Sequence, residues 1–341
     1  MGLTYRSASQ RCAFPELRCA RGKGGAGELA AHLPAQPLPL EAHAPLQLPR
    51  TKQHPRLVPE HAPKSPESSS TTSARPGTLP PEAASFYREV LRAMNDHGLP
   101  YAVAGAFALE KYTGIWRLTK DLDLFLKPDD VPRALDYLRA QNFHCETPDP
   151  VWLSKAFRGE YFVDLISGMS NAAMVVDDSW LGRTQPATIA GVESQILSPE
   201  DLLASKLFVT RRERFDGADI AHIIYRTQGK LQWERILELT GEHWEMLLWA
   251  LILFRYVYPA HSDFVPSRLW QDLLSRYGKL VQTHDPQAPF RGSLVDENIF
   301  SIDMKDWGLE DIQSMYRARH LRKHATCVAT APHSARKAGN E

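Results

Sequence analysis

One apolar segment in the middle of the chain constrains the fold more than any other feature of the sequence. Residues 120–126, Lys-Asp-Leu-Asp-Leu-Phe-Leu, are typical of a strand, but Asp121 and Asp123 interrupt it. Successive side chains of an extended chain point to opposite faces, so the two acids share one face and Leu122 and Leu124 share the other. The pattern predicts a buried strand with two carboxylates on its open face.

A third acid, Asp164, interrupts the apolar segment 161–166 in the same way. Carboxylates that lie side by side on a sheet repel one another and lose hydration, which is costly without a partner. If the two strands are neighbours, the three acids converge, and a divalent cation would balance their charge. Hard oxygen ligands favour Mg²⁺ or Mn²⁺. An acid-x-acid pair alone fits a solvated strand face equally well, so the metal site depends on the combination.

Helix and strand signals alternate around these segments. Pro80 and Pro81 mark the start of a helix that Gly98 ends, and Ser198 with Pro199 marks the start of a later one. Between them, the patterns predict strands at 101–104, 120–126, 151–157 and 161–166 and helices at 106–112 and from 128 onward. This order predicts an α/β (α+β) fold with a mixed sheet flanked by helices.

Composition divides the chain into four zones. Residues 1–77 have no Trp, Ile or Asp and hold 11 of the 25 prolines, which predicts a disordered Pro-rich extension. We expect the domain that carries the acid-interrupted strands at 78–227, a mainly helical region at 228–324 and a disordered tail at 325–341.

The overall charge and the cysteines exclude some classes of protein. Forty basic and forty acidic residues cancel, which argues against a protein that coats nucleic acid nonspecifically. The four cysteines are scattered without a metal-binding spacing, so we expect free thiols and a cytoplasmic location. The apolar run 244–258 is too short to cross a bilayer, so we expect a buried helix and no membrane partner.

The combined motifs resemble those of the DNA polymerase β superfamily of nucleotidyltransferases. The resemblance rests on VAGAFALEKYTGIWRLTKDLDLFL at 103–126 and on YFVDLIS at 161–167. The sequence is also similar to uncharacterised bacterial nucleotidyltransferases related to abortive-infection (AbiEii-type) toxins. That similarity rests on RLTKDLD at 117–123 and on SPEDLLASKLFVTRRERFDGADIAHII at 198–224. Together the resemblances cover about residues 85–260.

The resemblance implies a nucleotidyltransferase fold and a metal-dependent reaction that moves an NMP from an NTP to a hydroxyl acceptor. By the two-metal mechanism of that superfamily, Asp121 and Asp123 would bind both Mg²⁺ ions. Asp164 would bind the ion beside the acceptor hydroxyl. These three acids are therefore the expected catalytic and metal-binding residues.

The resemblance also implies a nucleotide-binding set. Gly105 and the backbone N–H of Ala106 would cradle the triphosphate at a helix start, with Lys206, and Lys120 or Arg117, neutralising its charge. Ala106 departs from the superfamily pattern, which has Gly or Ser there, so no hydroxyl is available for phosphate. For Lys206, a salt-bridged helical surface is an equal alternative.

Three functions remain open from the sequence. The first is an active transferase that modifies an RNA end, a protein hydroxyl or a small molecule. Alternatively, it is the toxin of a defence pair, with the same chemistry and an antitoxin-like partner. The third function is a degenerate nucleotide-binding module, which Ala106 favours and the three acids oppose.

Overall fold

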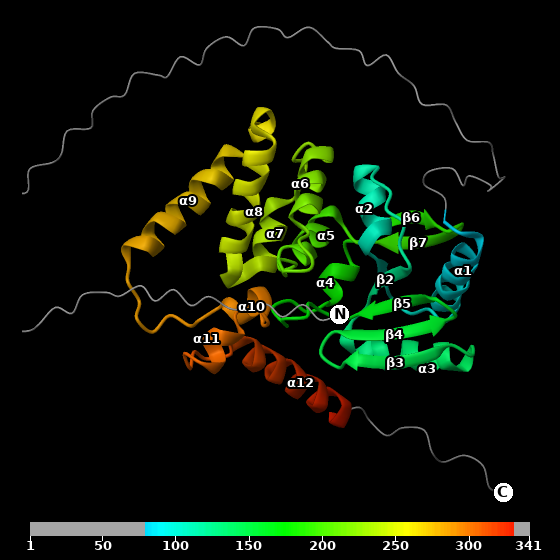
Figure 1. Ribbon diagram of the computed structural model, residues 1–341. Coiled ribbons are helices and arrows are strands. Elements are labelled where there is room, and N and C mark those ends of the chain that lie inside the picture. Colours follow the sequence, from blue (N-terminus) through cyan, green and yellow to red (C-terminus); the bar gives the residue numbers. More distant parts are fainter. Residues whose placement is uncertain (1–78, 331–341) are drawn as a thin grey trace, which may run out of the picture. The chain divides into compact units, whose positions relative to one another are not determined.

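A seven-stranded mixed sheet organises the described part of the chain, which is residues 79–330 of the computed structural model, with side chains to residue 322. The strands lie in the order β3-β4-β5-β2-β1-β7-β6 (Figure 1). Pairs β2/β5 and β1/β7 are parallel, and the other neighbours are antiparallel. The predicted mixed sheet flanked by helices is confirmed.

The elements alternate in the first half of the chain and are helical in the second. The strands are β1 (Ala102–Val103), β2 (Asp121–Phe125), β3 (His144–Asp149), β4 (Leu153–Arg158), β5 (Tyr161–Ile166), β6 (Gln185–Ile189) and β7 (Val192–Ile196). The α-helices are α1 (Pro81–Asp96), α2 (Gly105–Thr113), α3 (Val131–Ala140), α4 (Asp178–Leu181), α5 (Pro199–Lys206), α6 (Gly217–Arg226), α7 (Trp233–Thr240), α8 (Trp244–Val257), α9 (Ser267–Gln282), α10 (Gly292–Asp296), α11 (Ser301–Lys305) and α12 (Ile312–Thr330). Three short 3-10 helices are η1 (Pro128–Asp130), η2 (Gly241–His243) and η3 (Pro259–Phe264).

The sequence patterns did not predict three of the seven strands. The edge strand β3 is mostly exposed and polar, so it lacks the alternation that marks a half-buried strand. Strands β6 and β7 form a hairpin, and β6 is also an edge strand with only its last residue buried. Strand β7 does alternate, with Val192, Ser194 and Ile196 buried, but it is only five residues long.

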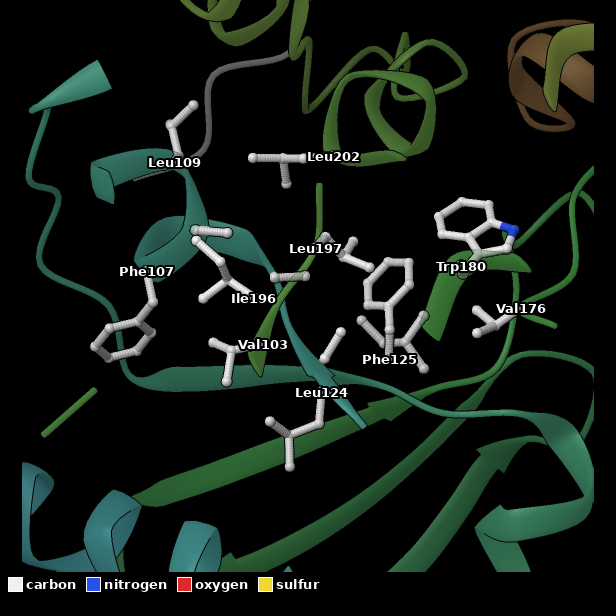
Figure 2. Packing of buried hydrophobic residues seen from close by; sticks show 14 of the residues in the cluster. Val103, Phe107, Leu109, Leu124, Phe125, Val176, Trp180, Ile196, Leu197 and Leu202 are labelled. Carbon is white, nitrogen blue, oxygen red and sulfur yellow. The ribbon is translucent and has the colours of Figure 1, made fainter. Parts of the chain in front are cut away.

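The two faces of β2 have different environments, as its alternating sequence predicts. Leu122 and Leu124 have no exposed surface and belong to the main core. Figure 2 shows Leu124 and Phe125 on opposite sides of the strand, with the Phe125 ring beside Trp180 of α4. The centroids of these two rings lie 5.8 Å apart. The leucines therefore anchor β2, and the opposite face remains for the acids.

One expectation about the helices needs correction. The apolar run 244–258 forms α8, but the helix is not buried all round, because Trp249, Ile252 and Tyr256 are exposed. Its neighbours cover only one side of it. Helix α12 continues to Thr330, past residue 325, where we expect the disordered tail to start, and that boundary stays a prediction.

The other zone boundaries stay predictions. The expected disorder of 1–77 lies outside the described residues, and so does that of 331–341. The chain described here, 79–330, belongs to one compact unit, in which the boundary at 227 is not visible as a division. None of the helices in this part is long and apolar enough to span a bilayer.

Candidate active site

The pairing of β2 with β5 brings the three predicted acids together. The strands run parallel, and Asp123 lies directly opposite Asp164 in the register. One carboxylate oxygen from each of Asp121, Asp123 and Asp164 lies within 4.8 Å of the other two. The predicted convergence is therefore found, and we call these residues the acidic triad.

The charge of the acidic triad is only partly balanced. Thr119 donates its hydroxyl to Asp121, and Lys155 donates to Asp164 Oδ1 at 2.6 Å. Among the described residues, none forms a hydrogen bond or an ion pair with the Asp123 carboxylate. Burial and the neighbouring charges of Asp121 and Asp164 raise the pKa of Asp123 to about 7. The pKa of Asp164 is also raised, chiefly by burial, although Lys155 opposes the shift.

Gly105 lies against the acidic triad and has no room for a side chain. A Cβ atom at this position would lie 1.7 Å from Asp123 Oδ2. Its φ of +54° also belongs to the left-handed region that favours glycine. The backbone approaches Asp123 because Ala104 N donates to Asp123 O at 2.9 Å as β1 ends. Helix α2 therefore begins beside the carboxylates, with its first backbone N–H groups free of helical partners.

A cavity of about 240 Å³ opens over the acidic triad. One wall, which we call the sheet wall, consists of Ala104, Gly105, Asp121, Asp123, Phe125, Trp152, Asp164, Ile166, Gly168, Met169 and Ser170. The helix wall consists of Leu202, Ser205, Lys206, Phe208, Val209, Arg211, Arg214 and Asp216. The predicted cap of α5 is confirmed, because Ser198 Oγ accepts from Asp201 N at 3.1 Å.

A buried ion cluster supports the helix wall. Lys206 Nζ contacts Asp216 at 2.7 Å and Asp219 at 2.8 Å, and all three side chains are less than a tenth exposed. Arg117 contacts Asp219 at 2.6 Å, and Arg214 contacts Asp216 with two nitrogens, at 3.0 and 3.1 Å. Two carboxylates and three cations thus share this cluster, which we call the ion cluster.

The structure separates the predicted nucleotide-binding residues. Gly105 lines the cavity, but Ala106 does not. Lys206 also lines the cavity, but its ammonium group is buried between two carboxylates. It is therefore salt-bridged, but not on an exposed helical surface. Lys120 is 72% exposed, pairs with Glu160 and does not line the cavity. Its side chain alternates away from that of Asp121, so the expected role of Lys120 at the nucleotide is not supported.

Two basic residues of the site were missed by the sequence patterns. Arg214 lines the cavity, its side chain is 68% exposed, and it lowers the pKa of Asp123. Lys155 lies directly opposite Asp164 on β4. The alternation of the segment 151–157 could have placed it on the same face as the acids, but only after the pairing of β4 with β5 is known.

The chemistry of the donors fits a hard divalent cation. Three carboxylates provide oxygen ligands from two adjacent strands, and burial together with their mutual repulsion raises the pKa of Asp123. Within the described chain, no other group of three or more acidic, histidine or cysteine side chains is arranged to hold a metal.

The chain is similar to one protein family and to several solved structures. The model of a family described as uncharacterised nucleotidyltransferase matches residues 83–254. The solution structure of the antibiotic-resistance factor ANT(2'')-Ia is 17% identical, covers 53% of this chain and 97% of its own, and has a TM-score of 0.36. An antigenic nucleotidyltransferase-like protein from Paracoccidioides brasiliensis is 17% identical, covers 55% and 95%, and has a TM-score of 0.36.

A third structure is that of the lincosamide antibiotic adenylyltransferase LnuA. It is 12% identical, covers 42% of this chain and 96% of its own, and has a TM-score of 0.31. No curated protein matches the chain.

Proposed function

The chain belongs to this family of nucleotidyltransferases, and on that premise we propose that it moves an NMP from an NTP to a hydroxyl acceptor in a metal-dependent reaction. The observation that carries the proposal is the acidic triad, whose oxygens lie within 4.8 Å beside a glycine that has no room for a side chain. The triad supports catalysis more directly than the fold does, because one fold can carry many functions.

The start of α2 is the proposed cradle for the triphosphate. Helix N-termini present unpaired N–H groups and a positive dipole, both of which favour phosphate. Gly105 lines the cavity next to Asp123, so a phosphate can approach the backbone there. Ala106 contributes only its N–H group, which does not depend on its side chain.

Arg214 is the proposed cation for the triphosphate, in place of Lys120 and Lys206. Its side chain is more exposed than those of the other cations of the ion cluster, and among the described residues it contacts only Asp216. Lys206 already balances Asp216 and Asp219, so it stabilises the helix wall from which Arg214 reaches the cavity. Arginine also binds phosphate with two parallel hydrogen bonds.

Asp121 and Asp123 are the residues proposed to hold two divalent ions, and Asp164 is proposed to hold only the ion on the acceptor side. Bound there, the ions would neutralise the triphosphate and lower the pKa of the acceptor hydroxyl. Lys155 keeps Asp164 Oδ1 engaged at 2.6 Å, which leaves the other oxygen of Asp164 available to that ion. Asp164 thus orients the attacking group from the β5 side of the cavity.

The toxin role and the loss of activity stay as alternatives. The toxin has the same chemistry, and a neighbouring gene for a small antitoxin-like protein would support it. A degenerate binding module would bind NTP without turnover. The acidic triad argues against that module, because three carboxylates that serve no ligand would only destabilise the sheet. A cytoplasmic location also stays a prediction.

Label transfer tests the proposal. The full chain is incubated with Mg²⁺, a cell extract and each α-labelled NTP in turn, and the labelled product is identified. We expect one NTP to label a discrete product, which would identify the acceptor as RNA, protein or small molecule. Labelling should disappear with a chelator and with Asp123→Asn, and persist with Asp136→Asn, an exposed acid on α3. Labelling that persists with Asp123→Asn would refute the proposal.

A further inference from the structure

The cavity extends from the acidic triad toward the β5 side of the sheet, and this part has no assigned ligand. Gly105 lies on the β1 side of Asp123, whereas Asp164 lies on its β5 side. The proposed triphosphate cradle and the far part of the cavity are therefore on opposite sides of β2. We call the far part the distal subsite, which Trp152, Ile166, Met169, Ser170 and Arg211 line.

Arg211 is the cation of the distal subsite. Its guanidinium group donates to Ser170 Oγ at 2.8 Å and lies 3.7 Å from Glu297, and its side chain is 35% exposed. The second contact is longer than a direct hydrogen bond, so the group keeps capacity for another anion. An acceptor with an anionic group would meet a positioned guanidinium there.

The acids of the cavity offer nothing to a cationic acceptor. Asp216 already contacts Lys206 and Arg214. Under the proposed function, the carboxylates of the acidic triad bind the divalent ions. The cavity has no other acidic residue in its lining. Glu297 lies 3.7 Å from Arg211 but does not line the cavity, so a polycationic acceptor would bury its charge beside Arg211 without a carboxylate partner in the lining, which is costly.

Trp152 provides a flat apolar surface in the same subsite. Its ring N–H donates to Asp149 Oδ2 at 3.0 Å, which fixes the edge of the ring. Arg317 of α12 holds Asp149 in turn, with one nitrogen 2.9 Å from each carboxylate oxygen. Ile166 and Met169 complete an apolar lining. Such a surface favours a planar or aromatic body over an extended polar chain.

The C-terminal segment, residues 292–322, holds the loops that carry these side chains. Arg317 donates to Ser170 O at 2.9 Å, and Asn171 donates to Leu294 O at 2.8 Å. Asp296 accepts from the backbone of Arg212 at 3.1 Å. This segment lies outside the residues that the family model matches, 83–254. The lining residues of the distal subsite lie within that match, whereas the segment that holds their loops does not.

We propose that the distal subsite binds the acceptor and selects a planar molecule that carries an anionic group, with Arg211 binding the anion and Trp152 packing on the ring. Arg317 is a positioning residue that acts through Asp149 and Ser170. This inference rests on the proposed function for the identity of the acceptor side, but binding at the subsite does not require turnover.

Binding of four small probes to the full chain in Mg²⁺ tests the proposal by calorimetry. The probes are 4-hydroxybenzoate, its neutral amide, the cationic 4-hydroxybenzylamine and the non-planar trans-4-hydroxycyclohexanecarboxylate. We expect the benzoate to bind about tenfold more tightly than the amide, the scale of one charge-assisted hydrogen bond. It should also bind more tightly than the amine and the non-planar acid.

Variants assign the preference to residues. Arg211→Gln should remove the difference between benzoate and amide and leave amide binding unchanged. Arg317→Ala should weaken both about tenfold, with partial rescue by Arg317→Lys, whereas Arg319→Ala on the same helix should have no effect. Melting curves for each variant verify folding.

Three outcomes would overturn the proposal: no probe binds, the amine binds as tightly as the benzoate, or Arg211→Gln keeps the preference for the anion. Binding and label transfer together separate this failure from that of the proposed function. If Asp164→Asn binds the benzoate normally but the wild type transfers no label from any NTP, the distal subsite stands and the transferase proposal fails. If the wild type transfers label but shows no preference for the anionic probe, the transferase proposal stands and the distal-subsite proposal fails.

Discussion

The sheet wall and the helix wall of one cavity both carry acidic residues, but their charges are balanced in different ways. In the ion cluster that supports the helix wall, Asp216 and Asp219 share three cations, and Lys206 lies between them. On the sheet wall, the three acids of the triad have one cation in contact, Lys155. The cations lower the pKa of Asp216, whereas the pKa of Asp123 is raised.

This difference distinguishes a structural cluster from a binding site. Buried carboxylates that are fully paired hold neighbouring segments together. Removing one partner leaves an uncompensated buried charge, which destabilises the fold. Carboxylates that remain unpaired destabilise the folded chain and are typical of sites that bind a ligand. The two walls should therefore respond oppositely to substitution, with loss of stability on one and loss of activity on the other.

The largest expected effect is on transfer by the acidic triad. Asp164→Asn should lower the single-turnover rate by roughly 10² to 10⁴, the scale for losing activation of an attacking group, and keep Mg-NTP affinity within a few fold. Asp121→Asn and Asp123→Asn should weaken both. Asp121→Asn and Asp123→Asn should not lower the free energy of unfolding, because each removes repulsion, whereas Asp164→Asn also loses the ion pair with Lys155. If Asp164→Asn transfers at the wild-type rate, Asp164 has no role in catalysis.

Lys206→Met should have the opposite effect. The substitution leaves Asp216 and Asp219 buried without their shared ammonium group, so we expect a loss of about 3–5 kcal/mol in the free energy of unfolding. Urea denaturation would measure it, with Lys111→Met as control, since Lys111 has only an exposed pair with Glu110. Equal stability of the two variants would show that the ion cluster is not structural.

Gly105→Ala should combine a backbone and a contact effect. The left-handed φ alone costs about 1–2 kcal/mol for a residue with a Cβ. Gly98→Ala isolates this cost, because Gly98 has a φ of +65° and nothing within 4 Å of the added Cβ. The added Cβ at Gly105 also displaces the Asp123 carboxylate, so Mg-NTP affinity should fall about tenfold, or ~1.4 kcal/mol. Equal NTP affinity in both variants would remove Gly105 from the site.

The smallest expected effect is the pH dependence of stability without metal. Asp123 keeps its proton to about pH 7 in the folded chain, but only to about its ordinary pKa of 3.8 when unfolded. The folded chain therefore binds more protons between these values, and the free energy of unfolding falls as pH rises through 7. We expect a loss of about 1 kcal/mol between pH 6 and 7.

Two comparisons identify the origin of that slope. Asp123→Asn should flatten it, and saturating Mg²⁺ should oppose it by binding the deprotonated form. Asp216 has a lowered pKa, so its contribution is present above 3.8 and is lost only as pH falls below that value. A wild-type slope that survives Asp123→Asn would assign the titration to another group.

Local patterns were sufficient for much of the fold and for part of the site. The acid-interrupted strands, the helix starts at Pro81 and Ser198, and the shared face of Asp121 and Asp123 follow from periodicity and capping, which act over a few residues. The polar edge strand β3 was not predicted, because its own sequence does not alternate and its pairing with β4 depends on the sheet.

The sequence by itself determined which residues could bind a metal, because a carboxylate in an apolar strand is costly wherever the strand lies. Only the tertiary structure decided which cations are available to a nucleotide. Lys206 and Arg214 are both basic residues near α5, yet Lys206 is enclosed by two acids from the next helix and Arg214 reaches the cavity. The reason is that charge compensation depends on distances of a few ångströms between segments remote in sequence, which no local pattern records.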